Sequence, residues 1–296
     1  MANLANSFAS KFDSDFRLRT HGLTHNEIPL FQALHHTLVG LSNKFEIEEY
    51  HGTSHQVSFS CNRSYAREYP RCELSDLMII TFSSITRNAR LTYIQAKSER
   101  AILQSVQGHQ FSANLEQWFL LSLRPIITGI GAFDPPQDLL SNALLPSVGS
   151  FAFFYKDGAS QFQTFYAAAN TLFPPKPYSQ RYGKLQAQSQ NRVINNGGFT
   201  ECIAACGNYS FAESLYRLEI GTPVHSSIAQ ALPTRNWLAS ILGFQIENAS
   251  ENNKRSELAQ ELLKILAPEE SWYIPGSFGA KELIIIKSQE EFGTNR

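Results

Sequence analysis

Two short apolar runs between Cys72 and Arg100 constrain the fold of this chain more than any other feature. The first reads Leu-Met-Ile-Ile-Thr-Phe over residues 77–82, and the second reads Leu-Thr-Tyr-Ile-Gln-Ala-Lys over residues 91–97. A polar break at residues 83–88 separates them. Short runs rich in β-branched and aromatic residues, with a turn-forming segment between them, predict a β-hairpin that packs one face on a core.

Three polar residues stand out at one end of this predicted hairpin. Side chains alternate along a strand, so Gln95 and Lys97 share the face of Leu91 and Tyr93. Asp76 lies at the entrance of the first strand, where pairing with the second strand brings it alongside them. The sequence therefore predicts that a carboxylate, an amide and an ammonium meet at the end of the hairpin.

An aspartate on one strand followed by Gln-x-Lys on the next resembles the PD-(D/E)xK nuclease superfamily, over residues 24–157. Asp76 matches the aspartate of the motif, Gln95 the second acidic position and Lys97 the lysine. The Gln-x-Lys form is similar to that of methyl-directed restriction enzymes and related defence nucleases. Ser75 stands where a proline often precedes the aspartate. The resemblance implies an α/β fold of the restriction-endonuclease type, with a mixed central sheet flanked by helices and the core order αβββαβ.

The resemblance also implies a metal-dependent nuclease. Its metal ligands would be the Asp76 carboxylate, the Gln95 side-chain oxygen and the backbone carbonyl of Ala96. Oxygen ligands suit Mg²⁺, with Mn²⁺ as a second choice, and Lys97 would orient or deprotonate the attacking water. Because Gln95 supplies no charge, an alternative stays open. The chain would then be a catalytically weak nucleic-acid-binding subunit that needs a partner or ligand.

Two glutamates have both a structural and a functional interpretation. A 3.6-residue period predicts a helix over residues 26–43, in which Thr24 and Glu27 fit a capping box. The resemblance instead implies that Glu27, on the first helix of the fold, acts beside the metal. Glu73 lies three residues before Asp76, so it would face the opposite way in a regular strand. It joins the site only if the strand begins after it.

The expected element order continues the resemblance. Residues 45–50 and 56–61 read as extended, and the latter would be the first core strand. A helix from Asn114 ends before Pro125, and residues 149–155 form a strand. We expect residues 1–23 to be a flexible arm or a short helix, residues 24–160 the nuclease core, and residues 161–296 a largely helical extension of unknown role.

The C-terminal half carries weaker signals. Residues 173–199 are rich in Pro, Gln, Ser, Asn and Gly, which predicts a long loop. This loop is either simply exposed, or it contacts the substrate through its basic residues Lys176, Arg181, Lys184 and Arg192. Helices are predicted near 199–206, 210–219, 226–242 and 255–266, and a strand at 282–288. Cys202 and Cys206 would lie one helical turn apart, and we interpret them as structural thiols.

Composition and charge bound the class of protein. The chain has 296 residues, 43% hydrophobic and 17% charged, as in ordinary globular proteins. It has neither a run of about 18 apolar residues nor a signal-peptide pattern, so we expect a cytoplasmic protein that does not enter a membrane.

A net charge of −1 does not by itself indicate a nucleic-acid-binding protein, but a local group of basic residues is enough to contact phosphates. Arg71, Arg90 and Arg100 cluster around the motif strands and are the predicted substrate-binding residues. We expect nucleic acid as the substrate, with DNA first. A protein partner or a second copy of the chain stays open.

Overall fold

The computed structural model describes residues 3–41, 56–61, 67–175, 180–248, 254–266 and 280–288. The extended segment expected at 45–50 and the predicted loop cation Lys176 lie outside these ranges. Within them, no helix is long and apolar enough to cross a membrane.

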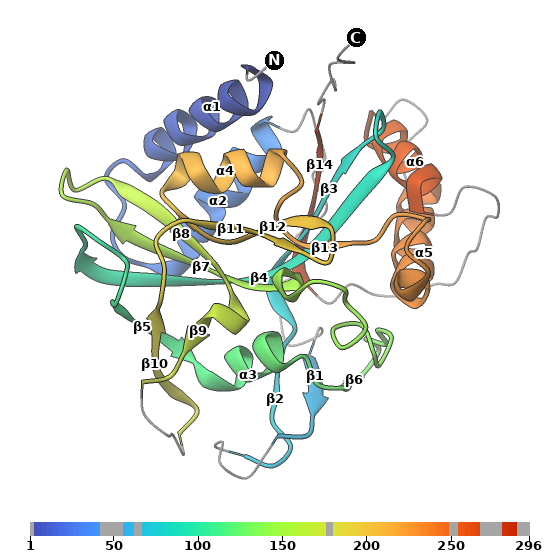
Figure 1. The fold of residues 1–296 in the computed structure, drawn as a ribbon, viewed down its shortest axis with the longest axis horizontal. Helices are drawn as coiled ribbons and strands as arrows, with labels where there is room; N and C mark the ends of the chain where they lie inside the picture. The colour runs from blue at the N-terminus through green and yellow to red at the C-terminus, as the bar shows by residue number, and fades with distance from the viewer. Residues whose placement is uncertain are drawn as a thin grey trace.

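A mixed eight-stranded sheet forms the centre of the molecule (Figure 1). Its strands follow the order β11-β12-β8-β7-β4-β3-β14, and β13 pairs with β4 beside this path. The β4–β7 and β3–β14 pairs are parallel, and the other pairs of the sheet are antiparallel. The bounds are β3 (Ser75–Ser83), β4 (Asn88–Ile102), β7 (Gly149–Lys156), β8 (Phe162–Ala168), β11 (Arg192–Asn196), β12 (Phe199–Cys206), β13 (Thr222–Pro223) and β14 (Ala280–Lys287). The predicted β-hairpin, the strand at 149–155 and the mixed α/β architecture are confirmed.

Helices cover both faces of this sheet, because its strands are apolar on both sides. On one face lie α1 (Asn3–Thr20), α2 (Glu27–Leu41) and α4 (Asn208–Tyr216), packed on Leu77, Ile79 and Ile94. On the other lie α3 (Leu115–Leu123), α5 (Leu232–Asn248) and α6 (Lys254–Leu266), in the core that holds Met78, Ile80 and Tyr93. Short 3₁₀ turns are η2 (Pro146–Val148), η3 (Ala169–Thr171) and η4 (Ala229–Ala231). The predicted helices at 26–43 and after Asn114 are confirmed.

Two small sheets extend the second core (Figure 1). The first has the order β2-β1-β6, with β1 (Gln56–Phe59), β2 (Arg71–Glu73) and β6 (Ile127–Gly129). The second has the order β5-β10-β9, with β5 (Gln110–Asn114), β9 (Leu172–Phe173) and β10 (Tyr182–Ala187). The prediction that residues 56–61 form the first strand of the central sheet is wrong. Phe59 stacks on Phe119 of α3 instead, and β1 pairs only with β2 and β6.

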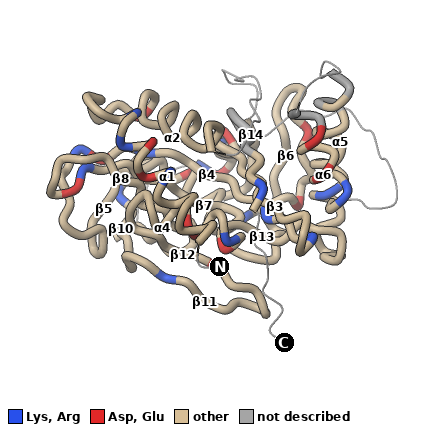
Figure 2. The backbone as a smooth tube through the Cα atoms, turned by 90° about the horizontal axis from the view of Figure 1, so that it is seen from above, with Lys and Arg blue, Asp and Glu red and all other residues tan. Residues whose placement is uncertain are grey.

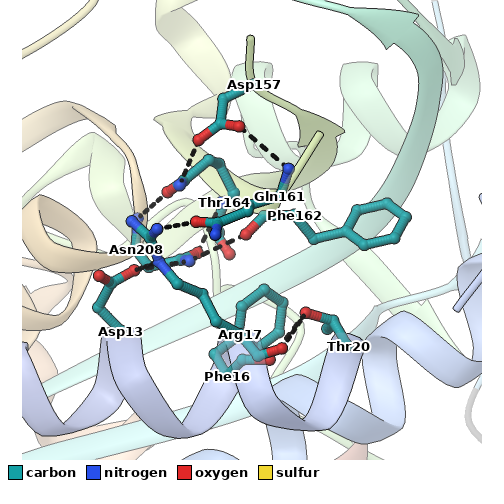
Figure 3. A network of polar contacts seen from close by, with 10 residues as sticks. Asp13, Phe16, Arg17, Thr20, Asp157, Gln161, Phe162, Thr164 and Asn208 are labelled. Atoms are coloured by element: carbon teal, nitrogen blue, oxygen red, sulfur yellow. Dashed lines mark hydrogen bonds and ion pairs between the residues drawn. The ribbon is translucent and has the colours of Figure 1, made fainter. Parts of the chain in front are cut away.

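The N-terminal residues form a docked helix, which agrees with the expected alternative of a helix and not with that of a flexible arm. Ala9, Phe12 and Phe16 of α1 are fully buried. Asn208 of α4 anchors the helix (Figure 3): its Nδ2 donates to Asp13 Oδ1 at 3.0 Å and to the Phe162 carbonyl at 3.1 Å, and its Oδ1 accepts from Thr164 N at 2.8 Å. A narrow apolar stripe in a polar sequence is enough to make α1 part of the core.

The boundary expected at residue 160 and the largely helical extension are also corrected. β8, β12 and β14 belong to the same central sheet as β3 and β4, and β7 and β8 pair directly across that boundary. Residues 199–206 form strand β12 and not a helix, and the predicted loop at 173–199 contains β10 and β11. The helices predicted near 210–219, 226–242 and 255–266 correspond to α4, α5 and α6, and the strand at 282–288 to β14.

Candidate functional site

The hairpin joins Asp76 to Gln95, as its alternation predicts. The β3–β4 register pairs Leu77 with Ile94 and Met78 with Tyr93. Just beyond this ladder, Asp76 Oδ2 accepts hydrogen bonds from the Gln95 side-chain Nε2 and, at 2.9 Å, from the backbone N of Ala96. Asp76 is 4% exposed and Gln95 1% exposed. A buried carboxylate is thus held by two donors of the neighbouring strand.

Lys97 and Glu27 complete the cluster. Lys97 Nζ donates to the Ala96 carbonyl at 2.7 Å and to Glu27 Oε1 at 3.1 Å. Glu27 is the first residue of α2, and the side chain that caps this helix is that of Asn26, whose Oδ1 accepts from Ile28 N at 3.3 Å. The Glu27 carboxylate therefore pairs with the lysine of the predicted site.

A pocket of about 650 Å³ opens over this cluster. One wall is lined by Glu27, Glu73, Asp76, Gln95, Lys97 and Ser98. Glu73 reaches it because the chain bends at Leu74, which separates β2 from β3 and breaks the alternation. The sequence alone leaves this outcome open. With Glu73 and Glu27 the wall carries two carboxylates besides Asp76.

The donor atoms fit a hard divalent cation. Gln95 Oε1 is buried and has no hydrogen-bond partner among the described residues. Leaving a buried acceptor unpaired costs about 1–3 kcal/mol, so such an atom favours a ligand. Asp76, Gln95 and the Ala96 carbonyl offer oxygen atoms only, the set that Mg²⁺ prefers. Within the described ranges no three His, Cys, Asp or Glu side chains converge on a metal position, so the amide and the carbonyl are essential to this set.

A second wall comes from distant parts of the sequence and carries two cations. It is lined by Ser112, Asn114, Gln117, Arg181, Tyr182 and Lys184. Arg181 Nε lies 3.4 Å from Glu116 Oε2, and Lys184 Nζ donates to Ser112 Oγ at 2.7 Å. The sequence predicts both cations in a loop of open role, whereas they lie on or just before β10 and line the same pocket as Asp76.

The buried Glu116 organises two of the cations near this wall. Arg67 forms a bidentate pair with it, Nε to Oε1 at 2.6 Å and Nη2 to Oε2 at 2.5 Å, and this hydrogen bonding raises the pKa of Arg67. Together with Arg181, the cluster has one positive charge in excess. Along the coloured trace of Figure 2 acidic and basic residues are interspersed, so the cationic character of the wall is local.

The predicted substrate-binding arginines lie elsewhere. Arg90 is buried on the other face of β4, where it donates to the carbonyls of Gly221 at 2.8 Å and Thr200 at 3.0 Å and lies over the Phe199 ring. Burial lowers its pKa to about 10. The prediction for Arg90 is wrong because its guanidinium is buried and occupied by these two backbone carbonyls. Arg71 and Arg100 are exposed, and neither lines the pocket.

The four cysteines are free, as expected, and Cys61, Cys72 and Cys202 are buried. Burial raises the pKa of Cys72 to about 12, so this thiol stays protonated and inert.

Comparisons of this chain with protein-family models, with curated proteins and with solved structures found no match. The chemistry of the site therefore has to follow from its own residues and their geometry.

Proposed function

We propose that this protein is a metal-dependent nuclease of the restriction-endonuclease-like fold, which hydrolyses phosphodiester bonds of DNA and serves in restriction or anti-phage defence. One observation carries the proposal: Asp76, Gln95, Lys97 and Glu27 converge in one pocket from β3, β4 and α2. The order α2, β3, β4, α3, β7, with β4 parallel to β7, supports the implied core order αβββαβ in part, because its first strand, predicted at residues 56–61, lies in a separate small sheet.

Each residue has a distinct task in this proposal. Asp76, the Gln95 oxygen and the Ala96 carbonyl would hold the ion, and Mg²⁺ bound there would neutralise phosphate charge and acidify a water molecule. Lys97 would orient the attacking water beside the scissile phosphate. Glu27 lies 3.1 Å from Lys97 Nζ and keeps the ammonium at the mouth of the pocket. Arg181 and Lys184 of the second wall would attract the polyanionic substrate.

A second candidate function rests on the hydrogen bonds at Asp76. Its Oδ2 is already satisfied by Gln95 Nε2 and Ala96 N, so the cluster is internally paired without an ion. This pairing favours a nucleic-acid-binding subunit that keeps the fold and cleaves weakly or only with a partner. The two candidates differ in whether the purified chain has metal-dependent cleavage.

The test is incubation of the purified protein with plasmid DNA, linear DNA and RNA, in Mg²⁺, in Mn²⁺ and in chelator. We expect metal-dependent cleavage by wild type, and none by Asp76→Asn or Lys97→Gln. Asp76→Asn removes the anionic ligand but keeps an oxygen that can accept from Ala96 N, so the fold should survive. Asp76→Ala would instead leave two buried donors unpaired, at a cost of about 1–3 kcal/mol each.

Two exposed residues outside the pocket provide matched controls, Asp134→Asn for the lost carboxylate and Lys11→Gln for the lost ammonium. Both variants should cleave like wild type, and thermal melts of all the proteins should agree closely. Wild-type cleavage by a folded Asp76→Asn protein would overturn the assignment of the site. Binding without any cleavage by wild type would favour the second candidate.

A further inference from the structure

The second wall of the pocket is one face of the paired strands β5 and β10 in the small β5-β10-β9 sheet. The register pairs Tyr182 with Asn114 and Lys184 with Ser112. Alternation sends Phe111 and Leu185 into the core, where both are fully buried. Tyr182, Lys184 and Ser112 therefore point outwards together and line the pocket.

Tyr182 is an exposed aromatic residue held on a fixed backbone. It is 65% exposed, and the Arg181 guanidinium lies 5.4 Å from the centre of its ring. The strand beneath it is pressed against α3, since a Cβ on Gly183 would come within 2.5 Å of Leu115 Cδ1. Leu115 N also donates to the Arg181 carbonyl at 2.8 Å. The ring is thus presented to solvent by a backbone with little freedom to move.

The charges beside the ring favour an anion. Glu116 balances only one of its two arginine partners, Arg67 and Arg181. Lys184 has no carboxylate partner in the described part of the chain and donates to a neutral hydroxyl. An exposed π-face flanked by cations is the combination that binds single-stranded nucleic acids, by base stacking and phosphate contact.

We propose that the β5–β10 face binds an unpaired nucleic-acid strand, with Tyr182 stacked on a base and Lys184 and Arg181 on the flanking phosphates. A paired base inside a duplex already stacks on both of its neighbours, so Tyr182 can engage only a base that is unpaired or extrahelical. The inference rests on the proposed function in one respect: nucleic acid is taken as the substrate. It adds that the substrate presents a single-stranded segment at the pocket.

The test measures binding without cleavage. Fluorescence anisotropy in chelator compares a labelled single-stranded oligonucleotide with a blunt duplex of the same sequence. We expect Tyr182→Leu to weaken binding of the single strand about tenfold, which is within the range measured for loss of one stacked base. Binding of the duplex should change little, and Tyr182→Phe should bind like wild type. Tyr69→Leu is the matched control, because Tyr69 is 68% exposed and does not line the pocket.

The salt dependence of binding tests the cations separately. Lys184→Gln should reduce the slope of log affinity against log salt by about 0.7 for the single strand, the value expected for one lost phosphate contact. Lys11→Gln removes the same charge from α1 and should leave the slope unchanged. The inference is overturned if Tyr182→Leu binds the single strand like Tyr69→Leu, or if it weakens both substrates equally.

These outcomes are separable from those of the nuclease assay. If wild type cleaves DNA and Tyr182→Leu binds single strands normally, the proposed function stands and base stacking on Tyr182 is refuted. If the protein binds single strands through Tyr182 but never cleaves, stacking is supported and nuclease activity is refuted.

Discussion

Gln95 is held through its nitrogen, while its oxygen remains without a partner. Its Nε2 donates to Asp76 Oδ2, and its buried Oε1 has no hydrogen-bond partner among the described residues. The amide therefore places a partial positive charge beside the Asp76 carboxylate. If the site binds a metal ion as proposed, glutamine at this position would stabilise the metal-free site and weaken the metal-bound one.

Gln95→Glu should reverse this balance. The change replaces a donor with a second buried carboxylate beside Asp76, at a cost of about 2 kcal/mol or more in the free energy of unfolding. We expect a melting temperature in chelator about 5 °C below that of wild type, by the usual relation between stability and melting temperature. Saturating Mg²⁺ should shrink or reverse the deficit, since the ion binds only the folded form.

Gln95→Leu is the companion variant, since it removes the ligating oxygen at similar bulk. It should lose metal binding and cleavage together, as measured by calorimetric titration and a parallel nuclease assay. If Gln95→Leu cleaves like wild type, Gln95 is not a ligand.

Glu27→Gln tests how the lysine is positioned. The partly buried ion pair between Lys97 and Glu27 should contribute about 1 kcal/mol to stability, so the melting temperature should barely move. If Glu27 orients Lys97, the same change should lower the cleavage rate and raise the Mg²⁺ concentration needed for half-maximal activity. An unchanged metal titration would show that Glu27 has only a structural role in the first turn of α2.

At this scale strand alternation predicted the contact between Asp76 and Gln95, because the two lie on adjacent strands of one hairpin. The same parity rule puts Arg90 on the opposite face, so proximity in sequence was a poor guide to its role. Arg181 and Tyr182 could not be assigned to the pocket, since their place depends on pairing with a strand about 70 residues earlier in the chain.

Among the elements, α1 departs most from its expected role. Its buried residues form one narrow stripe, and a hydrogen-bond network through Asn208 ties it to β8 and α4 (Figure 3). The polar composition of residues 3–20 gave no indication of this stripe. A few apolar residues are enough to dock a helix on the core when nearly all of their surface is buried. Strand β12 was misread for the opposite reason. Both of its faces are buried, so its apolar residues show no alternation that distinguishes a strand from a helix.

Phe12→Ala measures what docking of α1 contributes. Phe12 is fully buried against Phe16 and Phe211, so the truncation should lower the free energy of unfolding by about 3–5 kcal/mol. Leu18→Ala lies on the same helix at 75% exposure and should change stability by less than about 0.5 kcal/mol. Denaturant unfolding of both proteins decides the matter, and equal stability for the two would mean that α1 is not part of the folded core.

At the scale of the whole molecule, β14 joins residues 280–287 to β3, the strand that carries Asp76. It pairs in parallel with β3 over Ala280 to Lys287, and Lys287 Nζ bonds Glu261 Oε2 of α6 at 2.7 Å. The period and β-propensity of residues 282–288 predict a strand, but no local signal indicates its partner. Without β14, the nine-residue β3 becomes the edge of the sheet with every one of its residues apolar or buried.

Truncation before residue 280 should therefore give an aggregating protein, while truncation after Ser288 should not. An exposed, long and apolar edge strand templates pairing with other chains. Sedimentation and light scattering of the two truncated proteins, expressed side by side, provide the measurement. A soluble, monomeric protein without residues 280–288 would show that β3 tolerates an open edge.

The β3–β14 pairing also affects how the chain is made. Synthesis proceeds from the N-terminus at about 5–20 residues per second, so on the order of 10–40 s pass between the appearance of β3 and that of its parallel partner. During that time the nascent chain carries an open strand edge next to Asp76. The β3–β4 hairpin can form early, but its outer edge stays unpaired. A ribosome-bound chaperone is thus expected to shield β3, and the pocket around Asp76 is expected to form completely only after translation has passed β14.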